Sequence, residues 1–383
     1  MENRYEIAVV GGGVAGCAAA VSAAREGKRT VLFERSLTLG GLATNGLVNY
    51  FEPLCDGLGR QLIYGIAEEM LKRTVAIAGS DVPPVWQSGT DEERRAASTL
   101  PKNQSRYISH FTPALCSLAL IEWLKAEGVE IVFDALLTEV MREGDAVSGL
   151  KFATQNGYET FTADCYIDAT GSAEVFHRGG FETADGTNAA VYLAHTAGES
   201  AHLRMWNMWG DSAAFFAHKP FENYPGTTRE SINRMVQEGQ LELYRKLASG
   251  ELTEDVVALP SMPQFRTVRR IIGRYTLTEA DENRRFEDSL GVGGHFLKRG
   301  VWYEIPYRAL VSTAENVVAA GRIISADGDA WNATRVIPIA ALTGELSGLI
   351  SARAIEKKSA VYDLDYLALS KKANARGLLL HGE

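Results

Sequence analysis

The start of the chain constrains the fold more than any other segment. A strand predicted over residues 5–10 runs into a glycine turn. The turn carries Gly11, Gly13 and Gly16 in the spacing G-x-G-x-x-G, and after a helix of small residues a second strand ends at Glu34. A glycine triplet alone is a weak signal. Between a buried strand and such a helix, it predicts a dinucleotide-binding βαβ unit.

The residue types in this unit suit a pyrophosphate. Gly11 permits a tight turn, Gly13 lets the pyrophosphate approach the backbone, and Gly16 lets the helix lie close to the sheet. The small apolar run from Val14 to Ala24 belongs to this helix. Its free N–H groups and positive dipole end favour phosphates there. In the alternative interpretation the glycines serve packing alone.

Glu34 stands where the ribose of a bound dinucleotide would lie. Its carboxylate can accept hydrogen bonds from both ribose hydroxyls. The same carboxylate would repel a 2′-phosphate, so we expect a dinucleotide without one.

Composition is that of an ordinary globular protein. The 383 residues are 46% hydrophobic and 23% charged, with a net charge of −9. This balance gives no basic surface for nucleic acid or an anionic membrane. The N-terminus shows no secretory pattern, and no apolar run reaches the length of a membrane span. We therefore expect a cytoplasmic protein without a nucleic-acid partner or membrane span. The sequence leaves homo-oligomer formation open.

The four cysteines are scattered and form no C-x-x-C pair, which favours reduced thiols. Cys55 lies in a loop near the predicted ligand site. A structural role is favoured over a redox role there, because no resolving partner is visible. The seven histidines show no ligand spacing, so we expect no metal site.

The chain leaves the sheet after Glu34 and returns about 280 residues later, at the apolar segment 316–322. Excursions of this length usually build a ligand site or a further domain, which argues against a simple nicotinamide-binding fold. Predicted helices cover 59–78, 113–127, 228–247 and 338–356. Predicted strands cover 130–133, 136–142, 146–154 and 159–163, and another runs from 165 into a glycine turn at 171. Residues 80–105 are predicted to be an exposed excursion.

Four segments form an ordered pattern: the glycine turn with Glu34, the loop 40–44, the strand end 168–171, and 318–344. This pattern resembles the FAD-dependent oxidoreductases of the glutathione-reductase-like flavoprotein superfamily, and more narrowly the bacterial FAD-dependent oxidoreductase family. Similar stretches at 269–277, 285–288 and 303–310 extend the resemblance over most of the chain. Only 80–105 and 201–259 have no counterpart.

The resemblance implies an α/β fold: a Rossmann-like FAD-binding domain of the GR2 type with an inserted α+β substrate domain. The FAD-binding domain is expected over 1–179 with 312–360, the inserted domain over 180–311, and a C-terminal tail over 361–383. FAD is the implied cofactor. The implied cofactor-binding residues are Gly11, Gly13, Val14, Ala15, Gly16, Glu34, Arg35, Gly40, Gly41, Leu42, Ala43, Thr44, Ala169, Thr170, Gly171, Gly321, Arg322, Asp327, Arg335, Ile337 and Pro338.

In this superfamily the last helix, here following Arg335 and Pro338, directs its N-terminus at the flavin N1/C2=O edge. Reduced flavin is negative at that edge, so a positive helix end stabilises it. Arg335 could add to this effect. The alternative is an ion pair of Arg335 with Asp327 or Asp329.

Candidates for catalysis are His295, Tyr303 and Arg335. His295 lies in a glycine-rich loop and could act as a base or substrate anchor, or it could be a surface histidine in a linker. Tyr303 could line the flavin face or pack in the core. Arg266 and Arg269 could hold an anionic substrate group, with ordinary ion pairs as the alternative.

We therefore expect an FAD-dependent oxidoreductase that transfers a hydride between a small-molecule carbon and flavin N5. A flavin monooxygenase or halogenase shares the first glycine motif, although the halogenase motif W-x-W-x-I-P is absent. A dinucleotide-binding protein with non-redox chemistry and a non-catalytic flavin scaffold are further alternatives.

Overall fold

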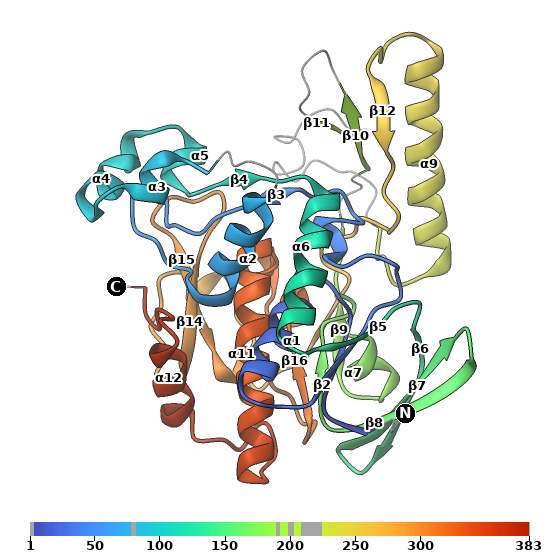
Figure 1. The fold of residues 1–383 in the computed structure, drawn as a ribbon, viewed down its shortest axis with the longest axis vertical. Coiled ribbons are helices and arrows are strands. Elements are labelled where there is room, and N and C mark those ends of the chain that lie inside the picture. Colours follow the sequence, from blue (N-terminus) through green and yellow to red (C-terminus); the bar gives the residue numbers. More distant parts are fainter. Residues whose placement is uncertain (1–3, 78–81, 189–191, 198–202, 208–223, 383) are drawn as a thin grey trace.

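The computed structural model describes residues 4–77, 82–188, 192–197, 203–207 and 224–382 (Figure 1). A seven-stranded sheet has the order β5-β2-β1-β8-β7-β6, with β16 also paired to β8. Pairing is parallel from β5 through β2, β1 and β8 to β16, which confirms the predicted α/β class. The strands are β1 (Arg4–Val10), β2 (Thr30–Phe33), β5 (Glu130–Val132), β6 (Leu136–Glu143), β7 (Ala146–Thr154), β8 (Gly157–Asp168) and β16 (Val317–Ala319).

Strand β8 corrects the prediction of two separate strands at 159–163 and from 165. It is continuous because its two halves have different partners. Its first half pairs with β7 in an antiparallel hairpin, with Thr154 opposite Gly157. Its second half pairs in parallel with β1 and β16, where Val10 and Ala319 both lie opposite Asp168. Strand β16, which follows the long excursion, therefore joins the sheet through β8. Strand β8 is also the neighbour of β1, the strand that leads into the glycine turn.

Helices α1 (Val14–Arg25) and α11 (Ile337–Lys357) lie side by side at the centre of the molecule (Figure 1). Small residues allow this approach, because a side chain at Gly344 would collide with the Ala15 carbonyl oxygen. Helices α2 (Gly65–Ala76) and α6 (Pro113–Ala126) pack next to them. The prediction that the second helix starts at 59 is wrong. It starts at Gly65, where the Glu345 carboxylate accepts the Ile66 N–H at 2.8 Å.

Most described side chains of residues 82–105 are exposed, as the predicted exposed excursion requires. These residues form four short helical segments, and Trp86 is buried and stacks on Tyr107 with ring centroids 5.1 Å apart. An apolar anchor thus holds this polar segment against the body of the protein. The segments are α3 (Pro84–Ser88), α4 (Asp91–Ala96), η2 (Ala97–Thr99) and α5 (Lys102–Ser105). Residues 80 and 81 lie outside the described part of the chain.

A second, smaller layer projects from the body (Figure 1). It pairs the three-stranded sheet β11-β10-β12 with helix α9, and Tyr192, Ala194 and Leu243 form its core. Its elements are β10 (Leu193–Ala197), β11 (Leu203–Asn207), β12 (Asp255–Ala258) and α9 (Arg229–Ala248). The domain boundaries at 179 and 311 stay predictions. Residues from Ile271 onward pack in the main core, which favours an earlier second boundary.

Smaller elements complete the fold. Leu369 and Ala373 of the last helix are buried in the main core, so residues 361–382 pack as part of the body. Among the described residues no single helix is long and apolar enough to cross a membrane. Helix α10 (Gly328–Thr334) and α11 reach that length and apolar character only together, across an 83° bend. These elements are β3 (Tyr50–Phe51), β4 (Ser109–His110), α7 (Glu174–Arg178), β9 (Thr183–Asp185), β13 (Arg269–Ile271), β14 (Ser289–Gly294), β15 (Trp302–Pro306), α10 (Gly328–Thr334) and α12 (Tyr366–Ala375).

Candidate cofactor and substrate site

A cavity of about 820 Å³ lies along the carboxyl ends of the parallel strands. This volume is in the range of ligand and cofactor sites. Most of the predicted cofactor-binding residues line it: Gly11, Gly13, Val14, Ala15, Glu34, Arg35, Gly40, Gly41, Leu42, Ala43, Ala169, Thr170, Gly171, Gly321, Arg322, Arg335 and Ile337. Gly16, Thr44, Asp327 and Pro338 do not.

The three glycines of the first turn differ in what surrounds them. Gly11 has φ +101°, and a Cβ there would lie 2.5 Å from the Ala169 carbonyl oxygen. A Cβ at Gly16 would collide with the Gly11 carbonyl oxygen, so Gly16 serves the packing of α1 on the strand. At Gly13 a Cβ would meet nothing within 4 Å, although Gly13 lines the cavity. Gly13 is therefore the position where the turn leaves room for a ligand.

Glu34 is buried at the end of β2, and its carboxylate forms part of the cavity wall. Oε2 accepts the Gly12 N–H at 2.6 Å, and Oε1 accepts the Ser36 N–H at 2.7 Å. Two backbone donors thus hold the side chain in one place. Each oxygen keeps a further lone pair for a ligand hydroxyl.

The loop after Glu34 lies directly beside the glycine turn, because the Gly40 N–H donates to the Gly12 carbonyl at 2.8 Å. Thr44 supports this loop from behind. Its hydroxyl donates to the Leu39 carbonyl at 2.5 Å, and its side chain fills the space next to Gly40. The pattern of small residues correctly located the loop, but it could not show which way Thr44 points.

The C-terminal turn closes the other side of the cavity. The Gly321 N–H donates to the Thr343 hydroxyl oxygen at 2.9 Å, and the wall includes Val336, Ile337 and Ala340 at the start of α11. The positive end of this helix therefore faces the cavity. Asp327 instead accepts the N–H of Gly328 at the start of α10.

Arg335 faces the cavity without a carboxylate partner within 4 Å among the described residues. Its Nε donates to Asn332 Oδ1 at 3.3 Å, and its guanidinium lies 5.9 Å from the centre of the Phe296 ring. The alternative ion pair with Asp327 or Asp329 is wrong. Asp327 pairs with Arg270 at 3.3 Å, and Asp329 pairs with Lys298 at 2.6 Å.

The structure places His295 behind the cavity wall. Its side chain is buried, and its Nδ1 accepts the N–H groups of Leu297 and Lys298 at 3.0 Å each. Nε2 lies 3.2 Å from Asp329 Oδ2, so the ring proton belongs on Nε2. Burial lowers the pKa of His295. The histidine thus holds the turn that carries Phe296 and Leu297 into the cavity.

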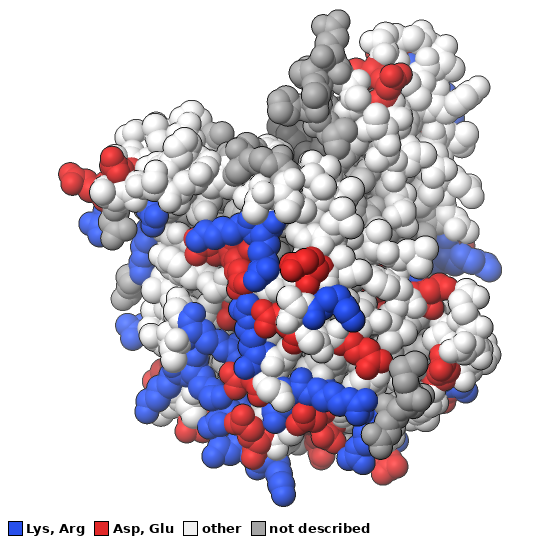
Figure 2. All heavy atoms as spheres, in the orientation of Figure 1, with Lys and Arg blue, Asp and Glu red and all other residues white. Residues whose placement is uncertain are grey.

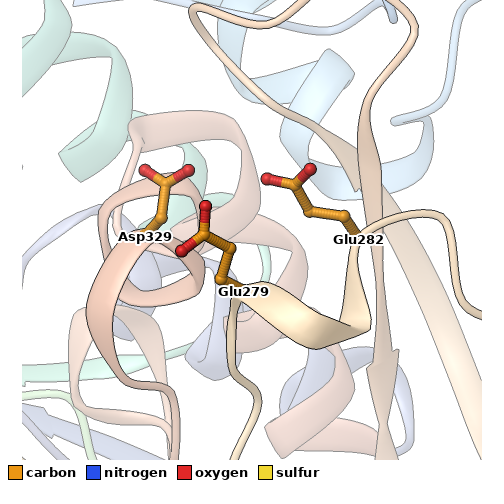
Figure 3. Close-up of side chains that lie close together, drawn as sticks. All are labelled: Glu279, Glu282 and Asp329. Atoms are coloured by element: carbon orange, nitrogen blue, oxygen red, sulfur yellow. The ribbon is translucent and has the colours of Figure 1, made fainter.

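Tyr303 is also buried and outside the cavity lining, and its hydroxyl donates to Glu282 at 3.3 Å. Glu282 belongs to an acidic group with Glu279 and Asp329, whose carboxylates converge (Figure 3). The Lys298 ammonium contacts all three carboxylates. The three carboxylates therefore share one lysine as their partner.

Sequence reasoning missed the end of the cavity that lies away from Glu34. Glu52 at this end is a buried carboxylate. It is 8% exposed, and its Oε2 makes no hydrogen bond within the described structure. The Lys102 ammonium lies 3.3 Å from that oxygen, and burial raises the pKa of the Glu52 carboxyl. No motif marks either residue. The other missed lining residues at this end are Val48, Tyr50, Leu193, Met262, Phe296 and Leu297.

The two arginines suggested as anion anchors separate in the structure. Arg269 pairs with Asp185 at 2.9 Å and is not a cavity residue. Arg266 lines the cavity, and Nη1 donates only to the Gln264 carbonyl at 2.5 Å. The suggestion that Arg269 holds an anionic substrate group is therefore wrong. Arg266 lies in the cavity wall, where such a group could reach it.

A family model described as FAD dependent oxidoreductase matches residues 6–223 and 220–372. The chain belongs to the FAD dependent oxidoreductase family. The predicted resemblance is confirmed, and FAD is the cofactor of this enzyme. The cavity fits that group, since it combines an open Gly13, a carboxylate at Glu34 and the positive end of α11.

One relative is the tRNA uridine 5-carboxymethylaminomethyl modification enzyme MnmG of Protochlamydia amoebophila (strain UWE25). It is 30% identical over 118 residues, which cover 28% of this chain and 18% of that protein. The chain thus matches about a fifth of that relative's length.

The solved structures with similar folds are more distant. A geranylgeranyl bacteriochlorophyll reductase-like protein from Thermoplasma acidophilum is 14% identical, with 97% of this chain and 82% of that chain covered and a TM-score of 0.46. The anhydrotetracycline hydroxylase of Streptomyces rimosus is 12% identical, with 97% and 65% covered and a TM-score of 0.48. Likeness at this level does not bear on the reaction.

Proposed function

We propose that this FAD-dependent oxidoreductase transfers a hydride between a carbon of a small-molecule substrate and flavin N5. The observation that carries the proposal is the continuity of the cavity. It runs from Gly13 and Glu34, past the start of α11, to side chains of the second layer and of the turn at Phe296. The space therefore extends beyond the residues suited to a dinucleotide, which supports a second ligand beside the cofactor.

We assign the ADP half of FAD to the glycine turn and Glu34, and the flavin half to the start of α11. When bound, FAD accepts or donates the hydride. Arg335 and the positive end of α11 would stabilise negative charge on the reduced cofactor. His295 and Tyr303 then support the wall rather than take part in proton transfer.

Glu52 is our candidate for proton transfer. Oxidation of an alcohol or amine releases the C–H hydrogen as a hydride and the O–H or N–H hydrogen as a proton. The hydride goes to the cofactor, and the proton needs a base within hydrogen-bond reach of the substrate. Glu52 borders the cavity beside Lys102, whose ammonium lies 3.3 Å from Oε2, and its raised pKa brings the carboxyl closer to the working range of a general base.

Leu193, Met262, Phe296 and Leu297 give this end of the cavity apolar walls. Such walls exclude water, which strengthens the electrostatic interactions of Glu52 and Arg335 with a bound molecule. They also favour a substrate with an apolar part.

The test is anaerobic reduction of the purified, FAD-loaded protein with a panel of alcohols, amines and hydroxy acids. We expect at least one compound to bleach the flavin absorbance directly, and its oxidised product to form in equal amount. A protein that binds no FAD would contradict the cofactor assignment.

Two other results would replace the proposed reaction. Reduction only by a nicotinamide cofactor, followed by oxygen uptake and a hydroxylated product, would establish a monooxygenase. Bound FAD that no donor reduces would indicate a scaffold or non-redox role.

A further inference from the structure

The charge of the cavity is opposite to the charge of the chain. The chain as a whole carries −9, and acidic and basic side chains are interspersed on the face in Figure 2. The cavity lining has six basic and three acidic residues, a formal charge of +3. The basic residues are Arg35, Lys102, Arg178, Arg266, Arg322 and Arg335, and the acidic ones are Glu34, Glu52 and Glu174.

The basic residues differ in their partners. Arg178 pairs with Glu174 at 2.9 Å, and Lys102 pairs with Glu52 at 3.3 Å. Arg266, Arg322 and Arg335 have no carboxylate within 4 Å in the described part of the chain, and they donate only to backbone carbonyls and one amide.

These three arginines also crowd one another. Burial, and then repulsion from Arg266 and Arg322, lowers the pKa of Arg335 to about 9, and burial lowers the pKa of Arg266 to about 10. Guanidinium groups stay protonated in proteins, so a bound anion is the natural way to relieve this repulsion.

FAD accounts for part of the positive charge. Its pyrophosphate carries two negative charges, which leaves a surplus of about one positive charge from the lining total. Arg322 belongs to the cofactor side, because its Nε donates to the carbonyl of Gly171, an implied cofactor-binding residue, at 2.7 Å. Arg35 directly follows Glu34, on the cofactor side, so Arg266 and Arg335 remain.

Arg266 is held in a fixed position in the cavity wall. Its backbone N–H and that of Thr267 both donate to Asn188 Oδ1 at 2.7 Å, so the chain is held firmly at this point. The Gln264 side chain, two residues earlier, donates to the Gly46 carbonyl at 2.7 Å. This hydrogen bond connects the second layer to the segment that directly follows the loop 40–44. The guanidinium keeps most of its five donors free for a planar anion.

We propose, building on the proposed function, that the substrate carries a single carboxylate, and that Arg266 binds it together with Arg335. A surplus of one charge matches a monocarboxylate better than a phosphate dianion. The planar guanidinium fork matches the two carboxylate oxygens. The bound carboxylate would place the rest of the substrate between the apolar walls and Glu52.

The test is an absorbance titration of the oxidised, FAD-loaded protein with benzoate and acetate, and with the uncharged benzamide and acetamide as matched probes. We expect the carboxylates to shift the flavin spectrum with millimolar or tighter dissociation constants, and the amides to leave it unchanged. Arg266→Gln should weaken carboxylate binding about 10- to 100-fold with full FAD content. Arg266→Lys should weaken it less. Arg285→Gln, at an exposed arginine outside the cavity, should leave it unchanged.

Three results would overturn this inference while the proposed function stands. The first is a wild-type protein with normal FAD content whose flavin spectrum does not respond to carboxylates. The second is an Arg266→Gln variant that binds carboxylates as tightly as the wild type. The third is loss of FAD from Arg266→Gln, which would assign Arg266 to the pyrophosphate. A wild-type protein without FAD would instead overturn the cofactor assignment itself.

Discussion

The two ends of the cavity are built in different ways. Around Gly13 and Glu34 the wall consists largely of backbone and small side chains from consecutive turns. Around Arg266 and Glu52 it consists of long side chains from segments far apart in the chain. The first end offers fixed N–H donors and space, which suits a group common to many flavoproteins. The second end offers charge and apolar contact, which suits selection of one substrate.

The largest effect should come from closing the space at the first end. Gly13→Asp places a carboxylate where nothing now lies within 4 Å, so the fold should survive while the pyrophosphate is repelled. We expect FAD affinity to fall about 1000-fold or more, a cost of about 4 kcal/mol. Bound flavin per chain measures this. Gly144→Asp, in an exposed hairpin turn, is the control, and a fully loaded Gly13→Asp protein would contradict the assignment.

A change at the second end should leave FAD in place and slow the chemistry. Glu52→Gln removes the proposed base, and we expect flavin reduction by the substrate to slow about 100-fold or more. The wild-type rate of substrate oxidation should rise with pH as Glu52 ionises, at a pH above the usual carboxyl range because its pKa is raised.

Stopped-flow reduction across pH measures this effect. The variant should lack the rise with pH. Glu92→Gln, at an exposed site, should keep it. An unchanged pH profile in Glu52→Gln would remove Glu52 from the proposed mechanism.

A smaller effect should follow from separating the two helices beneath the first end. In Gly344→Ala the new methyl group collides with backbone of α1, which cannot be relieved by a side-chain rotation. We expect the free energy of unfolding to fall by about 1–3 kcal/mol. FAD content should fall as well, since both helices begin at the cavity. Chemical denaturation measures the free energy of unfolding. The control is Lys357→Ala, at the exposed end of α11. A variant of wild-type stability would show that the helices can move apart freely.

The smallest effect concerns the turn that supports the second end. The pKa of His295 is lowered in the folded protein from its ordinary value of 6.5. As the pH falls through 6.5, this histidine therefore binds a proton more readily in the unfolded chain than in the folded protein. Stability should therefore decline as pH falls through 6.5, and part of this decline should vanish in His295→Gln. At neutral pH the variant should lose about 1 kcal/mol, because the N–H groups of Leu297 and Lys298 lose their acceptor. Denaturation curves for both proteins at several pH values test this, and parallel pH dependence would contradict it.

Local sequence predicted the first end well because each requirement there is local. The spacing of Gly11, Gly13 and Gly16, the strand before them and the acid after them all belong to one βαβ unit. The family resemblance added the loop at Gly40 and the turn at Gly321. The spacing also assigned Gly13 to the ligand and Gly16 to the packing of the helix, and the two glycines lie accordingly in the structure.

The errors have a common cause in pairing across the chain. β8 is one strand because three different strands pair along it. Arg335 faces the cavity because Lys298 and Arg270 already neutralise the aspartates near it in sequence. His295 serves a turn because two backbone N–H groups and Asp329 occupy its ring nitrogens.

By itself the sequence determined the dinucleotide turn, which depends on residue types at fixed short spacings, and through the family resemblance it also implied the α/β fold and FAD as the cofactor. Only the tertiary structure decided the second end of the cavity. Glu52 and Lys102 carry no motif, and the alternatives for Arg266 and Arg335 were settled only by burial, by their partners and by proximity across distant segments. Those properties exist only once the chain has folded.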